Sequence, residues 1–332
     1  MFACAVCAFG AVDGTVVNRT TGKPQAGAVV TLYKLGQAGG MQPVTTVRSD
    51  AGGKFLITQD ADGPRLLQTV FGGVVYSQML SPGTPTSGLS LDVFDTSNKP
   101  DVARLTSHFL VFQPSGARMT VTEGFIFQND SKVSYSDSLG GTLRFHLPAA
   151  AQGNVKVQAT APQGMPVERS AAKTAKPDIY KVDFPIKPGE TRFELTYSVP
   201  YAAPSDFSSR SLYKDTPTSL VAPPGVELKG AGLTLRGQEP RSQANVYEVR
   251  ATEFKVQVAG AMKVAEESEA AGGDPSIEQV LPRMHGSLAW ILALTFAVLA
   301  LGFALLYRAR LAEATVPPRP ATKKGANERR RR

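Results

Sequence analysis

Histidine, cysteine and serine are the residues of this chain that could support metal or nucleophilic chemistry. The histidines are His108, His146 and His285, and the cysteines are Cys4 and Cys7. No histidine pair has a metal-binding spacing such as His-x-x-x-His, and no group of Asp and Glu has the spacing of metal ligands. A histidine within a strand is usually structural, so we assign no metal ligand and no cofactor.

Covalent catalysis has no better support in the sequence. No serine lies in a Gly-x-Ser-x-Gly elbow, and no base can be recognised beside one. The Cys4-x-x-Cys7 pair lies in a small apolar stretch without a second pair, as in a secretory h-region. The glycine-rich stretches match no phosphate loop. We therefore expect no catalytic residues and a protein that is not an enzyme.

The net charge of +8 belongs almost entirely to the C-terminal tail. Residues 308–332 contain nine basic and two acidic side chains, which leaves the rest of the chain nearly neutral. Nothing in a nearly neutral body indicates a nucleic-acid-binding surface, so we expect no nucleic-acid partner. The 332 residues, with 42% hydrophobic side chains and abundant glycine and proline, predict two or three compact domains with many turns.

Residues 286–307 predict a transmembrane helix. The segment reads GSLAWILALTFAVLALGFALLY and contains no charge. At about 1.5 Å per residue it spans roughly 33 Å, enough for a hydrocarbon core of about 30 Å. Trp290 and Tyr307 lie near its ends, and Arg308 and Arg310 follow it. We assign these four residues to the membrane interface.

The flanking charges predict the orientation. The positive-inside rule places the basic tail, residues 308–332, in the cytoplasm and the preceding body outside it. An exported body requires a signal, and residues 1–10, MFACAVCAFG, are interpreted as the remnant of a signal peptide. The alternative is a cytoplasmic body with a tail anchor, which would force nine basic residues across the bilayer.

Short strand patterns indicate how this exported body is built. In residues 11–58 strand signals occur at 15–17, 28–33, 44–48 and 54–58, and turn residues separate them. The turn Asp50-Ala51-Gly52-Gly53 contains glycines that can adopt the positive φ angles of a tight hairpin.

These residues carry a resemblance to a known family. Gly14-Thr15-Val16-Val17, Thr21-Gly22-Lys23-Pro24 and Ser49-Asp50-Ala51-Gly52-Gly53-Lys54-Phe55 resemble the opening of a carboxypeptidase regulatory-like domain. The resemblance covers residues 11–97 and implies a prealbumin-like (transthyretin-like) sandwich of about seven strands without catalytic residues. The family's closing Pro-Gly-Tyr turn is matched only loosely at residues 62–65.

Residues 102–258 form a second all-β region with clear alternation. Hydrophobic residues of one parity recur within each of five segments: Met119, Val121, Phe125, Phe127; Leu143, Phe145, Leu147; Val155, Val157; Tyr180, Val182, Phe184, Ile186; and Phe193, Leu195, Tyr197, Val199, Tyr201. A period of two indicates strands with one buried face. Residues 202–216 are expected to form a loop, and 226–236 and 246–258 two further hairpins, which complete this sandwich or form a third unit from about 217.

The sequence thus predicts an all-β fold of tandem antiparallel β-sandwiches, a stalk at 259–285, a transmembrane helix and a basic tail. We expect a single-pass, non-enzymatic envelope protein with its body in the periplasm or at the cell surface. Its partners would be the lipid bilayer and an unidentified protein or glycan ligand. The alternative is a carbohydrate-binding module protein, suggested by fold analogy alone, because most Tyr and Phe side chains have the buried parity.

Overall fold

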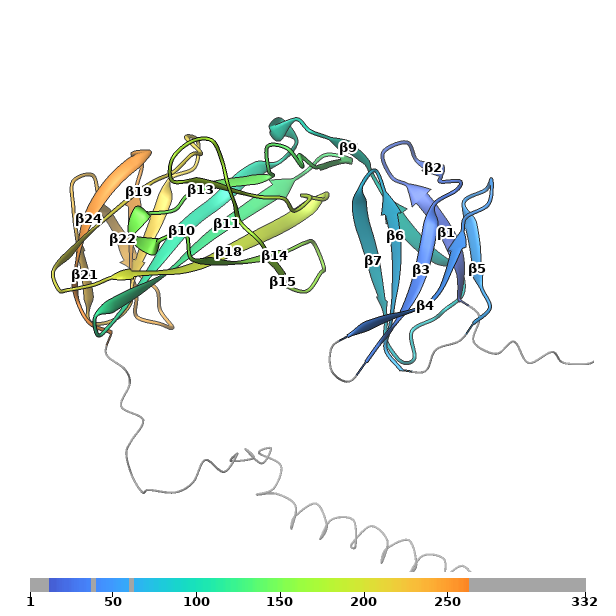
Figure 1. Cartoon of the computed structure of the whole chain (residues 1–332), viewed down its shortest axis with the longest axis horizontal. Coiled ribbons are helices and arrows are strands. Elements are labelled where there is room, and N and C mark those ends of the chain that lie inside the picture. The colour runs from blue at the N-terminus through green and yellow to red at the C-terminus, as the bar shows by residue number, and fades with distance from the viewer. Residues whose placement is uncertain (1–11, 37–39, 60–62, 263–332) are drawn as a thin grey trace, which may run out of the picture. The chain divides into compact units, whose positions relative to one another are not determined.

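The computed structural model describes residues 12–36, 40–59 and 63–262, and these residues are almost entirely β-structure (Figure 1). Most strand pairs are antiparallel, as expected. The buried hydrophobic side chains form two separate clusters, one within residues 12–93 and one within residues 103–258. We refer to strands β1–β8 as the first sandwich and to β10–β24, apart from β12, as the second sandwich.

The first sandwich consists of two four-stranded sheets. One contains β1 (Val12–Asn18), β2 (Lys23–Pro24), β5 (Lys54–Ile57) and β8 (Leu89–Val93). The other has the order β4-β3-β6-β7 and contains β3 (Val29–Leu35), β4 (Met41–Arg48), β6 (Arg65–Phe71) and β7 (Val74–Leu80). Alternate residues of both sheets, such as Val16, Leu32 and Leu67, point into one core.

An eight-stranded sheet forms one layer of the second sandwich, in the order β15-β14-β18-β11-β10-β20-β23-β22. Its strands are β10 (Arg104–Ser115), β11 (Arg118–Asn129), β14 (Val155–Thr160), β15 (Val167–Arg169), β18 (Gly189–Pro200), β20 (Thr218–Ala222), β22 (Thr234–Gln238) and β23 (Asn245–Val249). The alternation predicted for residues 119–127 and 193–201 is confirmed, because these residues point into the core.

Two three-stranded sheets share the core of the eight-stranded sheet. One contains β13 (Leu143–His146), β17 (Ile179–Val182) and β16 (Ala172–Lys173); the other contains β19 (Ser205–Arg210), β24 (Glu253–Gly260) and β21 (Val226–Lys229). The remaining elements are a parallel ribbon of β9 (Asp95–Ser97) and β12 (Val133–Tyr135), and the 3-10 helices η1 (Pro100–Val102) and η2 (Ala149–Ala151).

Two local predictions for the end of the second sandwich are wrong. The expected loop 202–216 contains strand β19, which pairs with β24. The expected hairpins are also absent from the described residues: β21 pairs with β24, and β22 pairs with β23. Alternation identifies a strand and its buried face but carries no information about which neighbour completes its hydrogen bonds.

The described residues contain no helix that is both long and apolar enough to cross a membrane. The predicted transmembrane helix 286–307, the stalk beyond residue 262, the basic tail and the signal remnant 1–10 lie outside the described residues. These assignments therefore remain predictions.

Candidate functional site

A groove of about 1200 Å³ lies in the second sandwich. Its floor includes Leu105, Phe127, Tyr135 and Ile179, all of which are at least nine-tenths buried. The volume exceeds the range typical of ligand sites, about 300–1000 Å³. The groove therefore has room for a ligand larger than a single small molecule, and we take it as the candidate functional site.

One wall of the groove is the turn between β12 and β13, which internal hydrogen bonds and an ion pair hold together. Asp137 Oδ1 accepts a hydrogen bond from the Gly140 backbone N–H at 2.6 Å, and the Arg144 Nε donates to the Gly140 carbonyl at 2.8 Å. Arg144 also lies 3.7 Å from Asp137 as an ion pair. These contacts hold Leu139 at the tip of the turn, where it is 87% exposed although it is a large apolar side chain.

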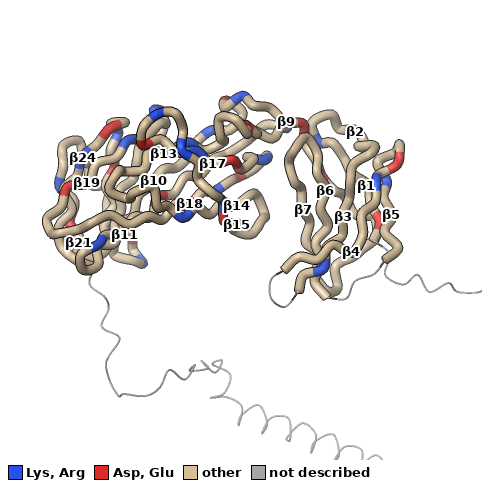
Figure 2. The backbone as a smooth tube through the Cα atoms, in the orientation of Figure 1, with Lys and Arg blue, Asp and Glu red and all other residues tan. Residues whose placement is uncertain are grey.

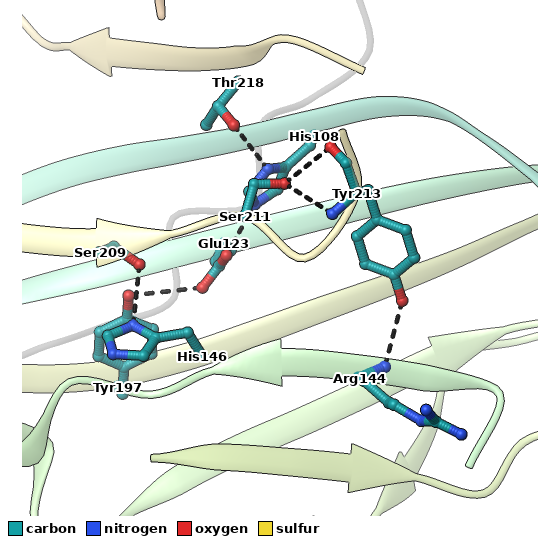
Figure 3. A network of polar contacts seen from close by, with 9 residues as sticks. All are labelled: His108, Glu123, Arg144, His146, Tyr197, Ser209, Ser211, Tyr213 and Thr218. Atoms are coloured by element: carbon teal, nitrogen blue, oxygen red, sulfur yellow. Dashed lines mark hydrogen bonds and ion pairs between the residues drawn. The ribbon is translucent and has the colours of Figure 1, made fainter. Parts of the chain in front are cut away.

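A second wall is the segment after β19, which carries Tyr213 into the sandwich. Ser211 Oγ closes the turn by contacting both the N–H and the carbonyl of Tyr213, at 3.2 Å each (Figure 3). The Tyr213 ring packs edge-on against Phe127 at 5.6 Å, and its hydroxyl accepts a hydrogen bond from the Arg144 N–H at 3.2 Å. Burial raises the pKa of Tyr213 to about 12, so this hydroxyl stays neutral at physiological pH.

The rim of the groove is positively charged. Six basic and three acidic side chains line it. The basic residues are Arg104, Arg144, Lys173, Lys176, Lys181 and Lys214, and several of them lie on segments around β13 and β17 (Figure 2). Within the described part of the chain, Lys173, Lys176 and Lys214 form no ion pair. These exposed ammonium groups can therefore contact a negatively charged ligand.

Beneath this region a chain of polar side chains crosses four neighbouring strands, β18, β11, β10 and β20 (Figure 3). His108 Nε2 lies 2.7 Å from Glu123 Oε1, and His108 Nδ1 lies 2.9 Å from the Thr218 hydroxyl. The Tyr197 hydroxyl donates to Glu123 Oε2 over a longer 3.5 Å. We call these four residues the polar ladder.

The polar ladder is inaccessible to solvent. The side chains of His108 and Glu123 are 1% and 2% exposed, and Phe125 stacks on the His108 ring at 4.4 Å. Burial, followed by the neighbouring Glu123 carboxylate, raises the pKa of Tyr197 well above its usual value. The hydrogen bond between His108 Nε2 and Glu123 Oε1 contains one proton, bonded to either the nitrogen or the oxygen. In both cases each buried polar atom of the pair has a partner.

The sequence contained a signal for this ladder that the pattern analysis missed. Glu123 has the same parity as the buried residues Val121 and Phe125, so a carboxylate interrupts an otherwise apolar inward face. A β-bulge between Leu105 and Ser107 shifts the register of β10 and thereby turns His108 inward. The first feature was visible in the sequence; the bulge was not.

A separate contact between His146 and Ser209 could support serine catalysis. The sequence had shown no base beside any serine. His146 Nδ1 lies 3.2 Å from Ser209 Oγ, in a hollow of about 490 Å³ (Figure 3). Burial, followed by the charge of Arg210, lowers the pKa of His146. Among the described residues no carboxylate bonds the other ring nitrogen, and an activated serine needs a base that a third group orients. This contact therefore does not carry a catalytic assignment.

The remaining site predictions concern metals and the membrane. Within the described ranges no group of three or more His, Cys, Asp and Glu could hold a metal ion. The four interface residues predicted from the sequence, Trp290, Tyr307, Arg308 and Arg310, lie outside the described residues, as do His285 and both cysteines.

Comparison with known proteins yields no family for this chain. No family model matches it, and no curated protein matches it in sequence. Solved structures with a local likeness include an M1 zinc metallopeptidase from Deinococcus radiodurans, as a mutant bound to the substrate Tyr-Ser-Ala, with 12% identity and a TM-score of 0.26 over 47% of this chain and 42% of that chain. Another crystal structure of this peptidase has 13% identity and a TM-score of 0.25. The match spans less than half of the peptidase, and at these TM-scores it carries no argument about activity.

Proposed function

We propose that this chain is a non-enzymatic, membrane-anchored envelope protein whose second sandwich binds an anionic envelope component in the groove. The observation that carries the proposal is the excess of basic side chains around a groove with an apolar and aromatic floor. Three of these cations, Lys173, Lys176 and Lys214, are exposed and form no ion pair within the described residues. A cleft with an excess of one sign of charge concentrates ligands of the opposite sign.

The anchor and the first sandwich complete the proposal. The uncharged segment 286–307 would hold the body at the outer face of the membrane, with the basic tail in the cytoplasm. The resemblance of residues 11–97 to a carboxypeptidase regulatory-like domain supports a structural role for the first sandwich. Its two four-stranded sheets are consistent with such a module.

The burial of the aromatic rings favours an anionic ligand over a neutral sugar. Sugar stacking requires an open ring face, but Phe127 and Tyr135 are only 3% and 5% exposed. The lysines of the rim are the exposed polar groups that a ligand would meet first. Binding should therefore depend on the charge of the ligand and weaken with salt.

The test uses the full-length chain in a nonionic detergent with two matched probes. Polygalacturonate carries a carboxylate on each sugar, and its fully methyl-esterified form has the same backbone without charge. We expect saturable binding of the first probe and little binding of the second. Equal binding of both would support the carbohydrate-binding alternative, and binding of neither would contradict the proposal for polymers of this kind.

A charge-matched pair of variants locates the binding. Replacing Lys173, Lys176 and Lys214 by glutamine should weaken binding of polygalacturonate about tenfold, because exposed ion pairs contribute about 0.2–1 kcal/mol each and 1.4 kcal/mol is a factor of ten. The control replaces Lys23, Lys34 and Lys54, exposed residues of the first sandwich, with glutamine. If the control weakens binding as much, the charge matters but the groove does not.

A further inference from the structure

Strand β7 lies at the open edge of its sheet. In the order β4-β3-β6-β7 it pairs with β6 alone. Its sequence, VVYSQML, contains no charge, no proline and no glycine. Proteins usually protect an edge strand with charges, proline, bulges or covering segments, and β7 contains none of the sequence devices.

The hairpin geometry determines which backbone groups of β7 point to the open edge. Two glycines, Gly72 and Gly73, form the turn with φ angles of 57° and 78°, as in a type I′ turn. In such a two-residue hairpin Phe71 and Val74 are a hydrogen-bonded pair, and bonded pairs then alternate along the ladder. The N–H and C=O groups of Val75, Ser77 and Met79 therefore point away from β6.

The same three residues lie on the outer, solvent-facing surface of the sheet. Val75 and Met79 are 44% and 40% exposed, and Val70, the partner of Val75 on β6, is 52% exposed. These side chains form an exposed apolar strip beside the unpaired backbone groups. Both features are typical of a strand that accepts another strand.

We propose that β7 pairs antiparallel with β7 of a second copy of this chain, about a twofold axis at Ser77. In this register Ser77 of one copy lies opposite Ser77 of the other, and Val75 of each copy lies opposite Met79 of the other. All three outward-pointing residues would then form hydrogen-bonded pairs, and no like charges would face each other because β7 has no charge. The β4-β3-β6-β7 sheets of the two copies would become one continuous eight-stranded sheet.

The contacts of β7 with β12 and with Lys187 of the second sandwich do not use these groups. Tyr76, which points into the core, bonds the Ser134 hydroxyl at 3.0 Å, and the Lys187 ammonium lies 5.0 Å from the Tyr76 ring centroid. Within the described residues the backbone of Val75, Ser77 and Met79 forms no hydrogen bond outside its own sheet.

Disulfide cross-linking tests the proposed register. The full-length chain in nonionic detergent, with Cys4 and Cys7 replaced by serine, receives either Ser77→Cys or the control Gln68→Cys. Ser77 would lie about 5.5 Å from its symmetry mate between Cα atoms, within disulfide range. Gln68 faces Ser77 on β6, and its symmetry mate would be three strand spacings, roughly 14 Å, away. We expect a covalent dimer with Ser77→Cys only; cross-linking at neither position, or equally at both, would overturn the proposal.

A charge at the axis gives a second measurement that does not depend on oxidation. Ser77→Lys would place two ammonium groups opposite each other and should raise the dimer dissociation constant roughly tenfold, measured by sedimentation in detergent. Gln68→Lys adds the same charge one strand further in and should leave the constant unchanged. Circular dichroism melts establish that both variants fold. A monomeric parent chain, or equal effects of the two lysines, would refute pairing through β7.

Discussion

The two sandwiches close their cores in different ways. The core of the first is built from thirteen buried hydrophobic side chains, and none of its buried side chains among the described residues is charged. The larger core of the second contains His108 and Glu123 among its aromatic residues. The described part of the first sandwich therefore packs without a buried charged side chain, although Asn18 and Ser49 are buried and hydrogen-bonded in it, whereas the central strands of the wide sheet are joined by a buried polar ladder.

This difference affects which strand register forms as well as how stable the fold is. Apolar side chains pack in many arrangements, but a buried carboxylate is tolerated only where its partner is in place. Glu123 on β11 requires His108 on β10, and His108 also contacts Thr218 on β20. We infer that the ladder selects the register of these strands, and the first sandwich, without such a pair, relies on its tight turns.

The largest expected effect comes from breaking the buried pair. Glu123→Leu leaves His108 Nε2 buried without a partner and should lower the free energy of unfolding of the second sandwich by about 3–5 kcal/mol. Hydrogen exchange measured peptide by peptide would show the loss in β10, β11 and β20. The double variant His108→Leu/Glu123→Leu should recover part of it, because the unpaired imidazole is removed, although the Thr218 and Tyr197 hydroxyls then lose their partners. If the single and double variants are equally unstable, packing rather than polar pairing accounts for the loss.

Removal of an apolar side chain from the first core should have the next largest effect. Leu32 is fully buried there, and Leu32→Ala should cost about 3 kcal/mol through lost contacts and a residual cavity. Because the two cores are separate clusters, protection in β11 and β18 should not change. The matched variant Leu220→Ala, at a fully buried position of the second core, should give the reverse pattern. Equal loss of protection in both sandwiches would mean that they unfold as one cooperative unit.

The smallest of the three effects concerns Lys187, the second-sandwich residue that contacts the Tyr76 ring. Burial lowers the pKa of Lys187 to about 8, so between pH 8 and its unfolded pKa near 10.5 the unfolded chain binds more protons than the folded chain. Stability should therefore rise with pH from about 8 to 10, by on the order of 2 kcal/mol.

Urea unfolding of the full-length chain at pH 7, 8, 9 and 10 measures this dependence. Lys187→Met retains the apolar length of the side chain and removes the titrating amine, so the rise should disappear in that variant. A parent chain whose stability falls steadily over this interval would show that the raised pKa values of buried tyrosines, which act in the opposite direction, dominate instead.

The fold class was predictable because the alternation of buried and exposed residues is a local property. Met119, Val121 and Phe127 point inward as their spacing indicated, and Gly53 adopts the positive φ angle expected of its turn. The groove was not predictable, because Leu139, Lys176 and Tyr213 come from three separate connections between strands. Each connection looks like an ordinary polar turn in the sequence, and only the folding of the strands beneath brings the three together.

The sequence by itself determined most of the strands and their buried faces, with β19 missed, and that an uncharged stretch of membrane-spanning length lies near the C-terminus. The tertiary structure decided which strands become neighbours, including the parallel pairs β1–β8 and β10–β20. It also decided that β21 and β22 join different sheets. The physical reason is that side-chain alternation is set within one strand. The partners of a strand, and polar contacts between strands such as His108–Glu123, depend on residues from separate segments of the chain. Only the packed core selects which of these segments pair.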